Sequence, residues 1–242
     1  MTMTMPARTL PAANDLARAA RDLEGSPPDD ILRWALDTYR PRITLACSFG
    51  GVSGMVLLDM VMALDASVPV FYLDTGFLFP ETYALAERAA ARYGISPRPL
   101  RPALTPLQQA AAHGDALWTR DPDRCCALRK VAPQREALCG MDAWITGLRR
   151  DQAATRRATP VVQWDSKFGL DKVNPLVGWD ERAVWRYVAD HDVPYNPLHD
   201  QGYPSVGCTH CTRPVAAGED PPRRPLGRLR ENRVRAAHRV SP

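Results

Sequence analysis

Apolar positions along the chain follow two alternating patterns. Short runs of consecutive apolar residues, typical of strands buried on both faces, alternate with segments of helical periodicity. The pattern predicts strands at residues 43–47, 68–73, 95–100, 143–146 and 161–164, and helices at about 54–64, at 80–92 and at 181–190. Gly94 follows the second of these helices and predicts a left-handed cap. Strands alternating with helices predict an α/β fold with a doubly wound, mostly parallel sheet.

The same pattern divides the chain into four parts. Residues 1–40 read as two short helices, the second opened by Ser26 as N-cap and by Pro28 in its first turn. Residues 41–170 form the α/β domain, whose ligands should bind at the carboxyl ends of the strands. Residues 171–220, rich in Pro, Gly, Tyr and Cys, read as a looser C-terminal segment. Residues 221–242 are a basic tail.

Composition narrows the class of protein. A length of 242 residues with 45% hydrophobic and 24% charged residues is typical of a folded domain with a small appendage. No apolar run approaches the roughly 18 residues that a membrane span needs, and the N-terminus has no compact apolar signal core. We therefore expect a cytoplasmic protein that does not bind a membrane. The sequence is compatible with a homo-oligomer but does not indicate one.

The net charge of +4 comes from the tail. Residues 221–242 hold seven Arg and one Glu, so the first 220 residues carry a net charge of −2. A basic tail on an acidic body does not favour a nucleic-acid partner.

Six cysteines carry the most specific local signal. Cys47 lies in an apolar stretch and Cys139 at a predicted helix end, and both are interpreted as small buried hydrophobes. Cys125 and Cys126 are adjacent, whereas Cys208 and Cys211 form a Cys-x-x-Cys pair. Adjacent cysteines chelate one ion poorly but can reach two irons of a cubane, so the spacing favours a 4Fe–4S cluster over zinc. His210 lies between the last two cysteines. The favoured interpretation is that it binds no metal, and the alternative is that it replaces a cysteine as a ligand.

Three further segments are candidates for binding. The turn 48–54 could hold an anion at a helix N-terminus or could be a bland tight turn. Asp74, after the second strand, could accept hydrogen bonds from a ribose or an adenine amine, although a turn Asp is the simpler interpretation. Arg149, Arg150 and Arg156 cluster just after a strand, where forked guanidinium donors suit phosphate or sulfate oxygens. Lys130 could place positive charge beside the cysteines or simply lie on a helix surface.

Seven sequence segments together resemble one family. They are the Ser-Phe-Gly turn at 48–50, Leu-Asp-Thr-Gly at 73–76, Phe-Pro-Glu-Thr-Tyr at 79–83, and segments 121–130, 147–156, 172–179 and 202–214. On these motifs the chain resembles the assimilatory adenylyl-sulfate (APS) reductases, relatives of the 3′-phosphoadenylyl-sulfate (PAPS) reductases. Phe77 departs from the pattern, because a basic or polar residue often follows Leu-Asp-Thr-Gly in that family.

The resemblance implies a fold, a reaction and a set of residues. The fold would be the adenine-nucleotide hydrolase-like doubly wound sheet with an iron–sulfur C-terminal segment. The reaction would be the thioredoxin-dependent reduction of APS to sulfite and AMP, through an enzyme S-sulfonate. It would belong to sulfate assimilation and lead toward cysteine biosynthesis. Glutaredoxin is the other candidate reductant. A 4Fe–4S cluster would be held by Cys125, Cys126, Cys208 and Cys211. Substrate-binding residues would be Ser48, Phe49, Gly50, Gly51, Ser53, Asp74, Thr75, Gly76, Lys130, Arg149, Arg150, Gln152 and Arg156.

The tail breaks the family pattern. The family's nucleophile is a cysteine within Glu-Cys-Gly-Leu/Ile-His near the C-terminus, whereas no cysteine follows Cys211 in this sequence. If residues 231–237 are encoded as GAA AAC CGA GTG CGG GCT GCA and followed by His, a one-base shift gives Lys-Thr-Glu-Cys-Gly-Leu-His. We therefore hypothesise an extra base near the codons of Pro221 and Pro222. An unrelated basic tail is the alternative.

Two other functions stay open. One is a PAPS reductase with a cluster. The other, if the printed tail is real, is a catalytically dead nucleotide- and metal-binding protein.

Overall fold

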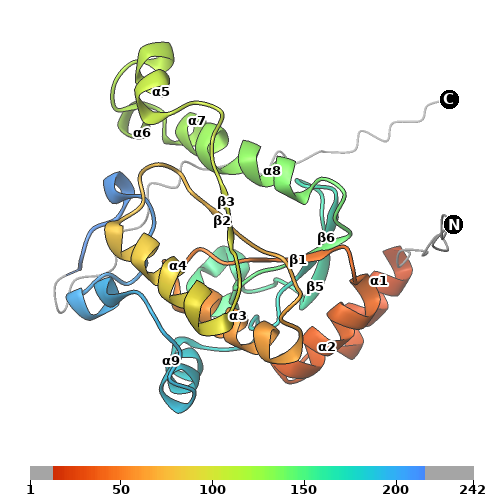
Figure 1. Ribbon diagram of the computed structural model, residues 1–242. Coiled ribbons are helices and arrows are strands. Elements are labelled where there is room, and N and C mark those ends of the chain that lie inside the picture. The colour runs from red at the N-terminus through yellow and green to blue at the C-terminus, as the bar shows by residue number, and fades with distance from the viewer. Residues whose placement is uncertain (1–12, 216–242) are drawn as a thin grey trace, which may run out of the picture.

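The computed structural model describes residues 13–215 and builds them around one six-stranded sheet (Figure 1). The strand order is β3-β2-β1-β4-β6-β5, and all neighbouring strands are parallel except the β5–β6 pair. The strands are β1 Ile43–Ala46, β2 Val70–Leu73, β3 Arg98–Leu100, β4 Ala143–Ile145, β5 Val162–Asp165 and β6 Leu170–Val173. The expected mostly parallel α/β fold is thus confirmed.

Helices connect the strands and extend the fold. They are α1 Ala13–Asp22, α2 Pro28–Tyr39, α3 Val52–Leu64, α4 Pro80–Tyr93, α5 Pro106–His113, α6 Leu117–Arg120, α7 Pro122–Cys126, α8 Ala132–Leu138 and α9 Glu181–Asp190. A π-helical turn, Ala127–Val131, joins α7 to α8. Short 3₁₀ turns span Arg150–Gln152, Ala154–Arg156, Pro197–Gln201 and Thr209–Cys211. None of the helices between residues 13 and 215 is long and apolar enough to cross a membrane.

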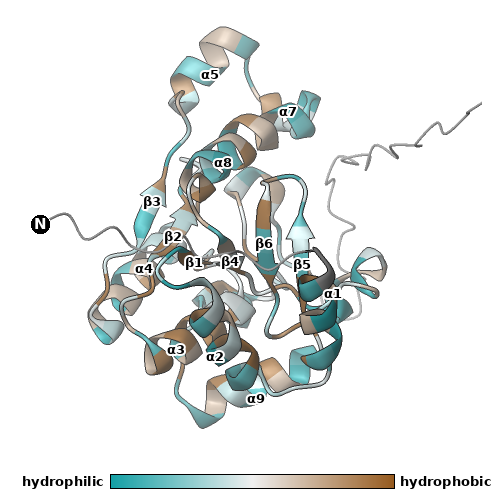
Figure 2. Cartoon of the chain, turned by 90° about the vertical axis from the view of Figure 1, so that its right-hand side faces the viewer, coloured by the Kyte–Doolittle hydropathy of each residue, from teal (hydrophilic) through white to brown (hydrophobic). Residues whose placement is uncertain are grey.

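The two faces of the sheet are covered unequally. Figure 2 shows α2 and α3 on one side of the strands and α8 on the other. The larger core lies on the α2–α3 side and includes Ile43, Leu45 and Ile145. The smaller cluster is built on Phe71, Leu100, Leu138, Trp144 and Leu170. Successive residues of a strand point to opposite faces, so Trp144 and Ile145 belong to different cores.

Most predicted elements agree with the structure, and three expectations are corrected. Gly94 has φ +63° and caps α4 as predicted. Pro27, not Ser26, is the N-cap of α2, and no side chain caps that end. Cys139 is exposed, because α8 ends at the buried Leu138 and the next residue turns outward, whereas Cys47 is buried as expected. Strand β6 was not predicted, and it places the start of the expected looser segment inside the sheet.

The sheet order reverses between β1 and β4. From β1 the chain winds outward to β2 and β3, and then returns to place β4 on the other side of β1. Ligands of such sheets bind in the crevice at this reversal, beyond the carboxyl ends of the strands. The reversal therefore selects the residues after β1 and β4 as a candidate site.

Candidate functional site

The first wall of the crevice is the turn between β1 and α3. Phe49 is fully buried with φ +52°, in the left-handed region, and its ring packs edge-on against Tyr72. Gly51 is the N-cap of α3, and the backbone N–H of Gly50 donates to Ser48 Oγ at 3.4 Å. The turn therefore directs the positive end of a 13-residue helix toward the crevice.

The second wall follows β4 and touches the first. A Cβ built on Gly147 would lie 3.1 Å from the Ser53 side chain, so glycine permits this close approach. Arg149 is buried and donates to Ser53 Oγ, while Asp151 accepts from the same guanidinium at 2.9 and 3.1 Å. A fixed guanidinium beside a helix N-terminus can bind an oxyanion. We call residues 48–54 and 147–152 the β1–β4 cradle.

The other predicted anion-binding residues divide into two groups. Gln152 Oε1 accepts from the Arg149 backbone N–H and from Arg156, so both arginines belong to one network. Arg150 instead points to the α1–α2 connection, where both Glu24 oxygens accept from it at 2.6 and 2.9 Å. This hydrogen bonding holds the pKa of Glu24 below its ordinary value. The structure thus separates Arg150 from Arg149, and its predicted role at the phosphosulfate stays a prediction.

The loop after β2 carries Asp74, Thr75 and Gly76. Asp74 accepts from the Gly76 backbone N–H at 3.1 Å, as a turn residue does, and also from Tyr83 at 2.7 Å and Arg101 at 2.9 Å. Burial raises the pKa of Asp74, but these bonds outweigh burial, and the net shift is downward. Asp74 is therefore a carboxylate at neutral pH, with the loop held around it.

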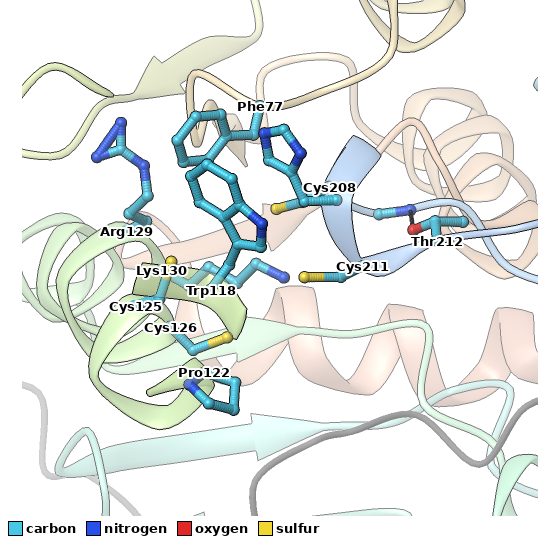
Figure 3. Close-up of a pocket in the computed structure, with 12 residues that line it drawn as sticks. Phe77, Trp118, Pro122, Cys125, Cys126, Arg129, Lys130, Cys208, Cys211 and Thr212 are labelled. Carbon is cyan, nitrogen blue, oxygen red and sulfur yellow. Dashed lines mark hydrogen bonds between the residues drawn. The ribbon is translucent and has the colours of Figure 1, made fainter. Parts of the chain in front are cut away.

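The four predicted metal ligands line one pocket, although Cys126 and Cys208 are 82 positions apart in the sequence (Figure 3). Cys125 and Cys126 end α7, whereas Cys208 precedes and Cys211 ends a 3₁₀ turn on the opposite wall. We call this the cysteine pocket; its lining comprises Phe77, Trp118, Pro122, Cys125, Cys126, Arg129, Lys130, Gly207, Cys208, His210, Cys211 and Thr212.

The Asp74 loop connects this pocket to the sheet. Thr75 Oγ1 lies 3.3 Å from Cys208 Sγ, and the backbone N–H of Thr209 donates to the Phe77 carbonyl at 2.7 Å. Burial raises the pKa of Cys125, with smaller raising effects from Cys126 and Cys208 and a lowering effect from a hydrogen bond with Gln109. Cys125 and Cys208 are thus buried, Cys126 is half-buried and Cys211 is exposed, and Cys125 is close enough to Cys126 and Cys208 to feel their charge.

The π-helical turn places two cations on the pocket wall. Adding one residue to a helical turn rotates the following side chains, and such turns are frequent at functional sites. Here Arg129 and Lys130 both line the pocket with Cys125 and Cys126. Figure 3 shows the Lys130 side chain extending from the helix across the pocket. Lys130 therefore lies on the wall of the pocket that the cysteines line, and its role toward a substrate stays a prediction.

Arg129 is the residue that the sequence analysis missed. Its side chain is 2% exposed, and it donates to the carbonyls of Thr75 and Leu104 and to Gln109. Its Nη2 atom is buried without a hydrogen-bond partner. A buried, incompletely paired guanidinium is costly unless an anion offsets it. Arg129 follows Cys125 by four residues, which is one helical turn, and this spacing was the sequence signal that could have placed it beside the cysteines.

The pocket brings together the four thiol ligands that a 4Fe–4S cluster takes. Within residues 13–215, no three His, Cys, Asp or Glu side chains converge as ligands of one metal ion. Zinc requires that convergence, since each sulfur lies about 2.3 Å from the metal. A cubane bonds each thiolate to a different iron and spreads the four sulfurs apart. The buried Arg129 guanidinium, whose Nη2 has no hydrogen-bond partner, also suits a cluster with anionic thiolate ligands.

Comparisons with known proteins agree with this geometry. The family model described as the phosphoadenosine phosphosulfate reductase domain matches residues 42–214. An adenosine 5′-phosphosulfate reductase of Halalkalibacterium halodurans is 47% identical over 199 residues, which cover 82% of this chain and 86% of that protein. A phosphoadenosine 5′-phosphosulfate reductase of Gloeobacter violaceus is 45% identical over 209 residues, covering 85% and 86%. The crystal structure of a Candida auris phosphoadenylyl-sulfate reductase in a phosphate complex superposes with a TM-score of 0.74 and 32% identity, covering 84% and 98%.

Proposed function

The chain belongs to the phosphoadenosine phosphosulfate reductase family, and on that premise we propose that it reduces adenylyl sulfate to sulfite and AMP. The observation that carries the choice of substrate is the cysteine pocket, because the resemblance associates the four cysteines with enzymes that use APS. The relative from Halalkalibacterium halodurans bears the corresponding name.

The β1–β4 cradle supplies the binding groups for the nucleotide. Arg149, fixed by Asp151, offers its guanidinium to the phosphosulfate at the N-terminus of α3. The turn 48–51 and the Asp74 loop would hold the adenosine, with Ser48, Thr75 and Gly76 at the carboxyl ends of β1 and β2. Lys130 lies on the pocket wall, where its ammonium can attract the sulfate group.

The reaction requires a nucleophilic thiolate that attacks the sulfate sulfur. A sulfur–sulfur bond forms, the bond from that sulfur to the bridging oxygen breaks, and AMP leaves with the electron pair. A thiolate of thioredoxin then attacks the cysteine sulfur, sulfite leaves, and the second thiol of thioredoxin resolves the mixed disulfide. The nucleophile is expected in the out-of-frame motif of residues 221–242, which lie outside the described residues.

We propose that Cys125, Cys126, Cys208 and Cys211 hold a 4Fe–4S cluster. Such a cluster, when bound, would fix the Cys125 and Cys208 segments to each other and present positively charged neighbours, Arg129 and Lys130, to the substrate side. The fit rests on the shared pocket and on the unpaired Arg129 Nη2.

Two measurements test the proposal. Intact mass and a C-terminal peptide map of the protein from its native source should reveal a peptide containing Glu-Cys-Gly-Leu-His. Sulfite release from APS and PAPS, assayed side by side with thioredoxin, should then favour APS. A clear preference for PAPS would overturn the choice of substrate.

A PAPS reductase is the second candidate, favoured by the name of the Gloeobacter violaceus relative. The third is a binding protein without catalysis, which follows if the printed tail is found by mass. That protein would bind AMP and iron and would release no sulfite.

A further inference from the structure

Three aromatic rings meet at the wall of the cysteine pocket. The rings of Trp118 and His210 stack with centroids 3.9 Å apart and planes 6° from parallel. The ring of Phe77 meets both edge-on, at 5.2 Å from Trp118 and 4.9 Å from His210. We call these three residues the ring cluster. Two of them, Phe77 and His210, are residues that the proposed function leaves without a role.

Each ring comes from a different segment. Phe77 is in the loop after β2, Trp118 is in α6 just before the helix that carries Cys125, and His210 lies between Cys208 and Cys211. The Phe77 loop is joined to the Cys208 segment by backbone contacts as well, through Thr209 N–H and an isolated bridge between Leu78 and Cys208. The Trp118–His210 stack adds a side-chain contact between the two cysteine-bearing segments.

Stacking also determines how the imidazole of His210 is oriented. An aromatic ring lying flat on an indole at van der Waals distance packs through its face, whereas a metal ligand presents a ring nitrogen along its edge. The His210 side chain is also exposed, so its energetic role is contact with Trp118 and Phe77 and not core filling. The stack engages the face of the ring and leaves the edge nitrogens free, so it shows a packing contact, and the variants below separate packing from ligation.

We propose that His210 is a positioning residue that holds the Cys208–Cys211 segment against the Cys125–Cys126 segment by stacking on Trp118. Cluster assembly must order four thiolates on two separate segments, and a preformed contact reduces the entropy that ordering costs. Phe77 completes the ring cluster, and its ring also lies under the Arg129 guanidinium, 4.5 Å from the ring centroid. This inference rests on the proposed iron–sulfur cluster.

The test measures how fast the loaded protein loses iron. The full-length protein is reconstituted with iron and sulfide, and release to a ferrous chelator is followed anaerobically by absorbance. His210→Ala should release iron about 3- to 10-fold faster than wild type, the range that an aromatic pair supports. His210→Phe keeps an aromatic ring and removes the nitrogens, so its release rate should stay close to that of wild type.

The outcomes separate the alternatives. Equal rates for His210→Ala and wild type would overturn the proposal. Equally fast release from His210→Phe and His210→Ala would overturn it in favour of a nitrogen ligand. Trp118→Leu should reproduce the effect of His210→Ala, and the double variant should be no faster than either single one, because both remove the same contact; additive effects would contradict the stack. A wild-type protein that takes up no iron would contradict both the proposed cluster and this inference.

Discussion

The β1–β4 cradle and the cysteine pocket lie at the same end of the molecule but are built differently. In the cradle, the polar groups already satisfy one another: Arg149 is paired with Asp151 and Ser53, and Gln152 links Arg149 to Arg156. In the pocket, the Arg129 guanidinium keeps a buried nitrogen without a partner, and burial raises the pKa of Cys125.

The difference shows which site depends on its ligand. A cradle whose dipoles are fixed before binding loses little conformational freedom when an anion arrives. A pocket with a buried, incompletely paired guanidinium and two buried thiols gains stability when an anionic partner fills it. We therefore expect nucleotide binding to be nearly independent of folding and iron binding to be coupled to it.

The largest expected effect comes from breaking the pocket. Cys208→Ser should abolish iron incorporation and lower Tm, because metal binding and folding are coupled. Cys139→Ser is the matched control, since Cys139 is exposed at the end of α8 and away from the pocket lining. Iron content and thermal unfolding check both variants; full iron in Cys208→Ser would refute the ligand assignment.

The next largest effect is expected from a substitution where the cradle touches the segment that leads to Cys208. A Cβ on Gly50 would lie well under 3.0 Å from the Val206 carbonyl oxygen, two residues before Cys208. Gly50→Ala should therefore cost about 1–3 kcal/mol of unfolding free energy, the usual penalty of overpacking. It should also weaken both AMP binding and iron retention. Gly178→Ala, where the new methyl would meet nothing within 4 Å, should be close to neutral by denaturant titration.

The two arginines after β4 sharpen the comparison. Arg149→Ala should weaken AMP binding about tenfold or more, since a charge-assisted bond of about 1.5–3 kcal/mol is lost. Iron content should not change. Arg150→Ala should alter AMP affinity by less than about threefold, because its guanidinium is engaged by Glu24. Calorimetric titration with AMP measures the affinity of both variants. Equal losses of AMP affinity would mean that Arg150 leaves Glu24 to bind the ligand.

The smallest effect concerns pH and that same ion pair. Since hydrogen bonding to Arg150 lowers the folded-state pKa of Glu24, the pair stabilises the fold above the unfolded pKa of about 4.3. This stability is lost as the pH falls through the lower, folded pKa. Glu24→Gln should lower unfolding free energy by under about 1 kcal/mol at pH 7, given the exposure of the pair. A difference from wild type that does not shrink at pH 3 would exclude this linkage.

Local sequence signals predicted the turn of the cradle and singled out the four cysteines that the structure brings to one pocket. Glycines and a serine between an apolar strand and an apolar helix specify the turn 48–54, and periodicity predicted α3, α4 and α9 within a few residues. The sequence did not show that Arg150 turns toward Glu24, because that contact joins residues 126 positions apart. It also missed Arg129, whose burial arises only when the loop after β2 wraps around it.

Strand β6 shows why some elements of the fold could be recognised only in the tertiary structure. Leu170-Asp171-Lys172-Val173 carries two charges and does not look like a buried strand. In the fold, the Tyr39 hydroxyl donates to Asp171 at 2.9 Å, and the Lys172 ammonium lies over the Trp144 ring at 5.0 Å. Partners supplied by distant segments offset part of the desolvation of both charges, although burial still raises the pKa of Asp171 and lowers that of Lys172.

The sequence by itself determined the parallel α/β class, the turn between the first strand of the sheet and its helix, and the choice of the four cysteines that line the pocket. These features depend on periodicity and on residue chemistry over short spans. The tertiary structure alone decided the strand order, the unequal cores and the meeting of Phe77, Trp118 and His210. These depend on long-range packing, in which the energy of each contact is set by residues far away in the chain.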